Sequence, residues 1–148
     1  MSVIDGALAE FFREYEARIG QVLAGNLDVE AMADAFAACF IRAEPRHIAG
    51  EPNEEQLRTV IVQRIAFCRS TGAKSLAIVS VATTALDTYQ YRAKVRWRAR
   101  YEQRDSTEGI IDFTDIYLLR AVGSKPKIFG SITGDVRQLY REQGLVTA

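Results

Sequence analysis

The chain has 148 residues, 48% of them hydrophobic and 26% charged, with 3 prolines and 10 glycines. This length and composition are typical of a single folded domain, residues 1–148, and exclude a disordered or low-complexity polypeptide. The 19 basic and 19 acidic side chains cancel. The chain therefore lacks the positive charge of a dedicated nucleic-acid-binding domain, and we expect no nucleic-acid partner.

The zero net charge hides an asymmetry between the two halves of the chain. Residues 1–57 carry 4 basic and 11 acidic side chains, whereas residues 58–148 carry 15 basic and 8 acidic ones. We expect an acidic layer to pack against a basic one.

Several classes of protein and site are disfavoured by what the sequence lacks. No apolar run approaches the roughly 18 residues of a membrane span, and the N-terminus is charged too early for a secretory signal, which predicts a cytoplasmic protein. Cys39 and Cys68 lie among apolar neighbours, which favours buried thiols over a disulfide. Because His47 is the only histidine, we expect no metal site. Glycine-rich phosphate motifs are missing, so we expect no cofactor.

The first half of the chain has helical periodicity. Apolar residues at three- and four-residue spacing predict an amphipathic helix from Ile4 to Leu23, ended by Gly25. A second helix is predicted from a cap at Asn26 or Asp28 to about Ala38.

A short strand over residues 40–44 follows and is ended by Pro45. Asn53 and Gln56 have the spacing of a capping box, which predicts the start of a third helix that ends at Gly72.

From Lys74 onward the period changes from 3.6 to 2, which indicates strands. They are expected over residues 76–86, 88–103, 110–122 and 128–132. Asp135 and Gln138 are expected to cap a short last helix before Gly144. Helices followed by strands predict an α+β fold: a curved antiparallel sheet wrapped around the long N-terminal helix, as a cone with an internal pocket.

Three stretches of sequence resemble the nuclear transport factor 2-like superfamily. These are AGNLDVEAMADAF, the strand that ends in Glu44-Pro45, and TDIYLLRA followed by a hairpin and a last strand. The SnoaL-like and ketosteroid-isomerase-like branch, with its cystatin-like fold, is the most similar. The superfamily includes isomerases, dehydratases, cyclases, ring-hydroxylase small subunits and non-catalytic binding modules, so the resemblance does not select an activity.

Asp115 is a lone acid on an apolar strand face, which it shares with Ile111, Phe113, Tyr117 and Leu119. Burying an unpaired carboxylate is costly, so such a group raises its pKa, pairs with a cation or contacts a ligand. The resemblance implies the last role, because ketosteroid isomerases keep an acid in the matching strand protonated to donate to an enolate. The alternative is an aspartate paired with an internal arginine for structural reasons.

Glu44 and His47 are the candidate acid–base residues. The resemblance matches Glu44, directly before Pro45, to the acid that moves protons in the isomerases. His47 follows it in the next loop and is suited to proton transfer near neutral pH. The alternatives are that Glu44 is solvated beside neighbouring arginines and that His47 is simply exposed.

Arg18 occupies the position that the resemblance assigns to the oxyanion-hole tyrosine of the isomerases, and Tyr15 lies about one turn earlier. A missing phenol there argues against steroid isomerisation, since one oxyanion donor contributes about 2–4 kcal/mol to lowering the barrier. Three roles for Arg18 remain open: pairing with Asp115 or Glu44, binding an anionic ligand, or lying along the helix edge with its charge in water.

The longest predicted strand alternates strictly between aromatic or small residues and cations. The aromatic face is expected to line the pocket. The predicted ligand-binding residues are Tyr15, Arg18, Trp97, Tyr101, Phe113 and Tyr117.

The opposite face of that strand carries a basic ladder, Arg92, Lys94, Arg96, Arg98 and Arg100. Three interpretations remain open: pairing within the chain with Asp112, Glu108 and Glu102; a homodimer interface whose partner supplies acids; or an anion-binding surface. The resemblance favours a homodimer, because the outer sheet face is a common dimer surface in this superfamily.

Together these features predict a small-molecule-binding or accessory domain with a mainly apolar pocket near Asp115, Trp97, Tyr15 and Glu44. One alternative is a cofactor-free isomerase or dehydratase, in which Glu44 or His47 moves a proton and Asp115 or Arg18 stabilises an oxyanion. A second is an oligomerisation module that uses the basic ladder.

Overall fold

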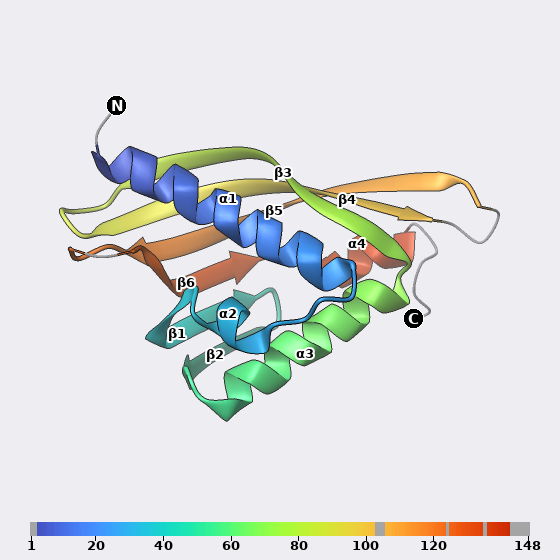
Figure 1. Cartoon of the computed structure of the whole chain (residues 1–148), viewed down its shortest axis with the longest axis horizontal. Helices are drawn as coiled ribbons and strands as arrows, with labels where there is room; N and C mark the ends of the chain where they lie inside the picture. Colours follow the sequence, from blue (N-terminus) through green and yellow to red (C-terminus); the bar gives the residue numbers. More distant parts are fainter. Residues whose placement is uncertain (1–2, 103–105, 124, 135, 143–148) are drawn as a thin grey trace.

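The computed structural model describes residues 3–102, 106–123, 125–134 and 136–142. Helices and strands follow the order shown in Figure 1. In chain order they are α1 (Val3–Leu23), α2 (Val29–Ala33), β1 (Phe36–Glu44), β2 (His47–Pro52), α3 (Glu55–Ser70), β3 (Ala73–Ala85), β4 (Gln90–Glu102), β5 (Glu108–Arg120), β6 (Lys127–Thr133) and α4 (Val136–Glu142).

The strands form one open, six-stranded sheet in the order β2-β1-β6-β5-β4-β3. Neighbouring strands are antiparallel except for β1 and β6, which are parallel. The sheet is therefore mixed, and the expectation of a wholly antiparallel sheet was wrong at this one pair. Figure 1 shows α1 lying across β3, β4 and β5, with α2 and α3 gathered near β1 and β2. The result is the α+β cone that the sequence predicts.

The core lies between α1 and the inner face of the sheet. Alternate residues of β4 from Tyr91 to Tyr101 are buried, as the period of two predicts. Leu8 and Phe12 of α1 pack against this face, and each is at most 2% exposed. Glu16 also joins α1 to the sheet, because its Oε2 accepts a hydrogen bond of 2.6 Å from the backbone N–H of Ile78.

The region between the first and third helices differs from the prediction. α2 ends at Ala33, and the residues expected to extend it form the start of β1 instead. The pairing of Phe36 with Ile128 of β6, and a 2.8 Å hydrogen bond from Ile128 N to Ala35 O, hold this segment in the sheet. β2, expected as a loop, pairs along β1 from Glu44–His47 to Cys39–Pro52.

Asn53 has a different role from the predicted helix cap. Its amide donates to the carbonyl oxygens of Ala33 (3.0 Å) and Phe36 (3.1 Å) and its Oδ1 accepts from Arg58 (2.9 Å). The N-cap of α3 is Glu54, whose side chain makes no capping bond. Asn53 therefore ties the start of α3 to the α2–β1 junction.

Both cysteines are free thiols. Cys68 is partly buried, but Cys39 is exposed, so the prediction of a buried thiol was wrong for Cys39. Phe40 takes the inner face of β1, which leaves Cys39 on the open outer face. The predicted cap Asp135 and the predicted stop at Gly144 lie outside the described residues. Within the described residues, no helix is long and apolar enough to cross a membrane.

Candidate functional site

The inner faces of β4 and β5 bring an acid and two aromatic side chains together. The register pairs Val95 with Asp115, Ala93 with Tyr117 and Trp97 with Phe113, so these side chains share one face of the sheet. Asp115 is 9% exposed and Trp97 is 1% exposed.

Tyr15 completes this group from α1. Its ring lies 6.2 Å from the rings of both Trp97 and Tyr117, measured between centroids. The Tyr117 hydroxyl also acts on the Tyr15 phenol as a hydrogen-bond partner that lowers its pKa. A phenol from the first helix, Tyr15, is thus present in the group that contains Asp115. The inward face of α1 is set by Leu8, Phe12 and Tyr15, at the spacing of one helical stripe.

The hydrogen bonding of this cluster is incomplete. The Tyr117 hydroxyl donates to Asp115 Oδ2 over 3.2 Å, but Asp115 Oδ1 has no partner among the described residues. The indole Nε1 of Trp97 lies near enough to the Tyr117 hydroxyl to lower its pKa, yet makes no hydrogen bond of normal geometry. We use "polar cluster" for Tyr15, Trp97, Asp115 and Tyr117.

Burial favours the protonated form of the acidic groups in the polar cluster. It raises the pKa of Asp115 from 3.8 to about 6, against the opposing effects of the Tyr117 hydroxyl and the Arg64 guanidinium. It raises the pKa of Tyr15 to about 12 and that of Tyr117 well above its ordinary value. Both phenols are therefore protonated at neutral pH and can donate hydrogen bonds. Asp115 changes its protonation state at about pH 6.

Arg64 of α3 is the cation that faces this cluster. It lowers the pKa of Asp115, Tyr15 and Cys68, and its Nη2 lies 3.2 Å from Glu44 Oε1. Arg64 was not among the site residues predicted from the sequence. Its position three residues after Ile61 and four before Cys68, within the apolar stripe of α3, was the available signal.

Glu44 and His47 lie together at the β1–β2 hairpin, where they are register partners. Both are exposed, and Glu44 pairs with Arg64 and, at 3.7 Å, with Arg42. Glu44 is thus joined to the region of Asp115 through Arg64. His47 has no described contact with the polar cluster.

Arg18 forms no ion pair or hydrogen bond with Asp115 or Glu44, so this predicted pairing is not found among the described residues. It lines two neighbouring cavities of about 360 and 30 Å³, and its charge helps to lower the pKa of Asp34. Tyr15 lines the smaller one, but Asp115 and Trp97 line neither. An apolar pocket beside Asp115 stays a prediction.

The remaining predicted ligand-binding residues divide between two cores. Tyr101 packs with Ile111 and Tyr140 in a second, small core. Phe113 is partly buried and contacts both cores.

The basic ladder is largely paired within the chain. Arg96 and Arg98 share Asp112 at 3.0 and 2.8 Å, and Arg100 pairs with Glu108 at 2.8 Å. Hydrogen bonds from Arg98 above all lower the pKa of Asp112 to about 2. The third predicted acid, Glu102, pairs with Lys74 instead.

The other two members of the ladder have weaker connections. Arg92 donates to Thr84 over 3.4 Å, and Lys94 has no hydrogen bond or ion pair within the described part of the chain. In the same part of the chain, no three His, Cys, Asp or Glu side chains lie close enough together to hold a metal ion.

No protein-family model matches this sequence, and no curated protein is significantly similar to it. Solved structures are similar in fold. An NTF2-like protein with a cystatin-like fold from Novosphingobium aromaticivorans has a TM-score of 0.68 and 12% identity, over 97% of this chain and 89% of that one.

Two further structures carry functional names. A ketosteroid isomerase-like protein from Erwinia carotovora atroseptica has a TM-score of 0.61 and 11% identity, covering 89% of this chain and 92% of that one. The beta subunit of the benzoate 1,2-dioxygenase from Burkholderia mallei has a TM-score of 0.61 and 17% identity, covering 90% of each chain. The chain therefore has the NTF2-like, cystatin-like fold, which is shared by proteins of different function.

Proposed function

We propose that this domain binds a small, mainly apolar molecule in its cone and holds one hydroxyl or carbonyl oxygen of that molecule with the polar cluster. The observation that carries the proposal is the pair of unsatisfied buried atoms, Asp115 Oδ1 and Trp97 Nε1. A buried polar atom without a partner costs about 1–3 kcal/mol, and a ligand that supplies the missing partner recovers that free energy.

The donors and acceptors of the cluster define the ligand group. Trp97 Nε1 donates, and Asp115 donates when protonated and accepts when ionised. A hydroxyl suits both states because it donates and accepts. A ketone oxygen suits the protonated state, which the raised pKa of Asp115 favours below about pH 6.

Trp97 provides the readout, because it is the only tryptophan of the chain and its indole N–H gives a single NMR signal. Cyclohexanol, cyclohexanone and methylcyclohexane are titrated at pH 5. We expect the two oxygenated compounds to shift the indole signal and to bind about tenfold more weakly to Asp115→Asn and Tyr117→Phe.

Asp112→Asn is the matched control on the same strand, since Asp112 faces the opposite side of the sheet. Equal binding of all three compounds, or an indole signal that none of them moves, would rule out the polar cluster as the ligand site.

The second candidate function is a cofactor-free isomerase or dehydratase, and the Arg64 link between Glu44 and the Asp115 region favours it. Glu44, or His47 beside it, removes a proton from a carbon next to a ketone. The enolate oxygen accepts hydrogen bonds from protonated Asp115 and the phenols, and the proton returns to another carbon or leaves with a hydroxyl as water. The similarity in fold to the ketosteroid isomerase-like protein is a reason to test for this chemistry.

Deuterium exchange into cyclohexanone tests this candidate. We expect the protein to accelerate exchange and Glu44→Gln to slow it about 100-fold, as for loss of a general base. His47→Ala measures whether the histidine shares the work. Exchange at the buffer rate, or rates unchanged in both variants, would exclude the enzyme interpretation.

We also propose that the protein forms a homodimer through the outer sheet face. Exposed Ile41, Ile48 and Ile132, on β1, β2 and β6, lie on the same face of the sheet as the basic ladder, and Lys94 lacks a partner within the described residues. The dioxygenase beta subunit shows that one protein of this fold is a subunit of a larger enzyme. Arg96→Glu with Arg98→Glu is expected to convert dimer to monomer in sedimentation. An unchanged profile, or a monomeric wild type, would refute the dimer.

A further inference from the structure

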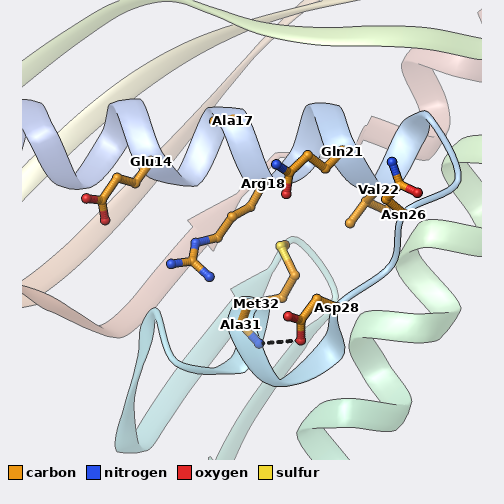
Figure 2. Close-up of a pocket in the computed structure, with 9 residues that line it drawn as sticks. All are labelled: Glu14, Ala17, Arg18, Gln21, Val22, Asn26, Asp28, Ala31 and Met32. Carbon is orange, nitrogen blue, oxygen red and sulfur yellow. Dashed lines mark hydrogen bonds between the residues drawn. The ribbon is translucent and has the colours of Figure 1, made fainter.

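A cleft lies between α1 and α2 (Figure 2). Its volume is about 360 Å³, within the range of small-molecule sites. Two buried side chains, Val22 and Met32, line it with apolar surface. The other lining residues are mostly polar and include Glu14, Arg18, Gln21, Asn26 and Asp28.

Arg18 is the cation that lines this cleft, and its charge helps to lower the pKa of Asp34. Figure 2 shows its side chain extending from α1 into the space between α1 and α2. It is only partly exposed, yet it makes no hydrogen bond or ion pair within the described part of the chain. A partly buried guanidinium favours a carboxylate partner, which its planar fork binds through two parallel hydrogen bonds.

The acids around Arg18 are already engaged by other groups. Glu14 pairs with Lys125 at 3.4 Å, and Asp34 pairs with Lys127 at 3.0 Å. Asp28 caps α2, because its Oδ1 accepts a 3.0 Å hydrogen bond from Ala31 N. Each of these carboxylates has its closest contact elsewhere, and none of them forms an ion pair with Arg18.

We propose that the α1–α2 cleft binds a small organic monocarboxylic acid, with its carboxylate on Arg18 and its apolar body against Val22 and Met32. The single unpaired cation matches a single negative charge. The exposed amides of Gln21 and Asn26 add neutral donors at the rim. This site is distinct from the polar cluster, because neither Asp115 nor Trp97 lines the cleft.

Hexanoate and its neutral counterpart 1-hexanol test the proposal by NMR titration at pH 7. We expect hexanoate to shift backbone amide signals of residues 14–32 and to bind at least tenfold more tightly than 1-hexanol. Arg18→Met keeps an apolar stem without the charge and is expected to weaken hexanoate binding at least tenfold while leaving 1-hexanol binding unchanged. Arg13→Met is the control, because Arg13 lies exposed on the same helix and pairs with Glu10.

A second variant tests the cleft without touching the charge. Ala17 lines the cleft from an exposed position of α1, so Ala17→Leu fills the space at little risk to folding. It is expected to abolish hexanoate binding, whereas Asp115→Asn is expected to leave it unchanged. The proposal is overturned if hexanoate and 1-hexanol bind alike, if Arg18→Met or Ala17→Leu binds hexanoate as the wild type does, or if the shifts map to Trp97 instead.

Discussion

Replacing Asp115 with asparagine tests whether burial keeps this carboxyl group protonated in the folded protein. Burial raises its pKa from 3.8 to about 6. Between these two pH values the folded chain holds a proton that the unfolded chain releases. The contribution of Asp115 to the free energy of unfolding therefore falls as the pH rises from about 3.8 to about 6. This contribution is constant at lower and at higher pH.

The size of the effect follows from the shift of about two pKa units, each equivalent to 1.36 kcal/mol, which gives about 3 kcal/mol. Asparagine has nearly the same shape and no titrating proton. The window from pH 4 to pH 7 covers most of this amount, so the difference in unfolding free energy between Asp115→Asn and the wild type should change by about 2.4 kcal/mol across it, in favour of the variant at the higher pH.

Urea unfolding at half-unit pH steps measures this difference. Asp112→Asn provides a control of opposite sign, because the pKa of Asp112 is lowered, to about 2, by Arg98 and Arg96. The stabilisation by ionised Asp112 is complete above pH 5 and is lost as the pH falls toward 2. The difference in unfolding free energy between Asp112→Asn and the wild type should therefore be constant from pH 5 to 8. A pH-independent difference for Asp115→Asn would refute the reasoning.

Three other predictions concern single substitutions at Arg64, Gly109 and Asn53. Arg64→Met should raise the pKa of Asp115, since the guanidinium lowers it; a ¹³C NMR titration checks this, and an unchanged pKa would show that Arg64 does not act on the site. Gly109→Ala should destabilise the protein by about 1–3 kcal/mol in urea, because its Cβ would lie 2.2 Å from the buried Tyr101 ring; wild-type stability would contradict this packing. Asn53→Ala should cost about 2 kcal/mol for the hydrogen bonds to Ala33 and Phe36, and a loss below 0.5 kcal/mol would count against that role.

The sequence was informative where a pattern is local and periodic. The alternation in β4 and β5 predicted which residues face the core, Asp115 among them, and the stripe of α1 predicted its length. β2 was missed because HIAGEP has no alternation and contains glycine and proline. The start of β1 was missed because FAAC is compatible with a helix, and only its distant partner β6 makes it a strand.

The candidate site was predicted less completely, since it depends on how elements rotate and pack. The sequence predicted Tyr15 and Arg18 as residues of one site, but only Tyr15 lies against Tyr117, because a shift of three residues changes the direction of a helical side chain by about 60°. Arg64 was missed because only apolar residues were counted in the stripe of α3. Its significance comes from Glu44 and Asp115, which lie on other elements.

The division of charge between the two halves of the chain helps to explain the position of Arg18. Acids of the first half pair across to cations of the second: Glu14 with Lys125, Asp34 with Lys127, Glu30 with Arg58 and Glu44 with Arg64. These pairs engage several acids on and beside α1 and α2. Arg18, a cation of the acidic half, forms no ion pair within the described part of the chain. We infer that a carboxylate from outside the chain fills this role, which the hexanoate titration of Arg18→Met decides.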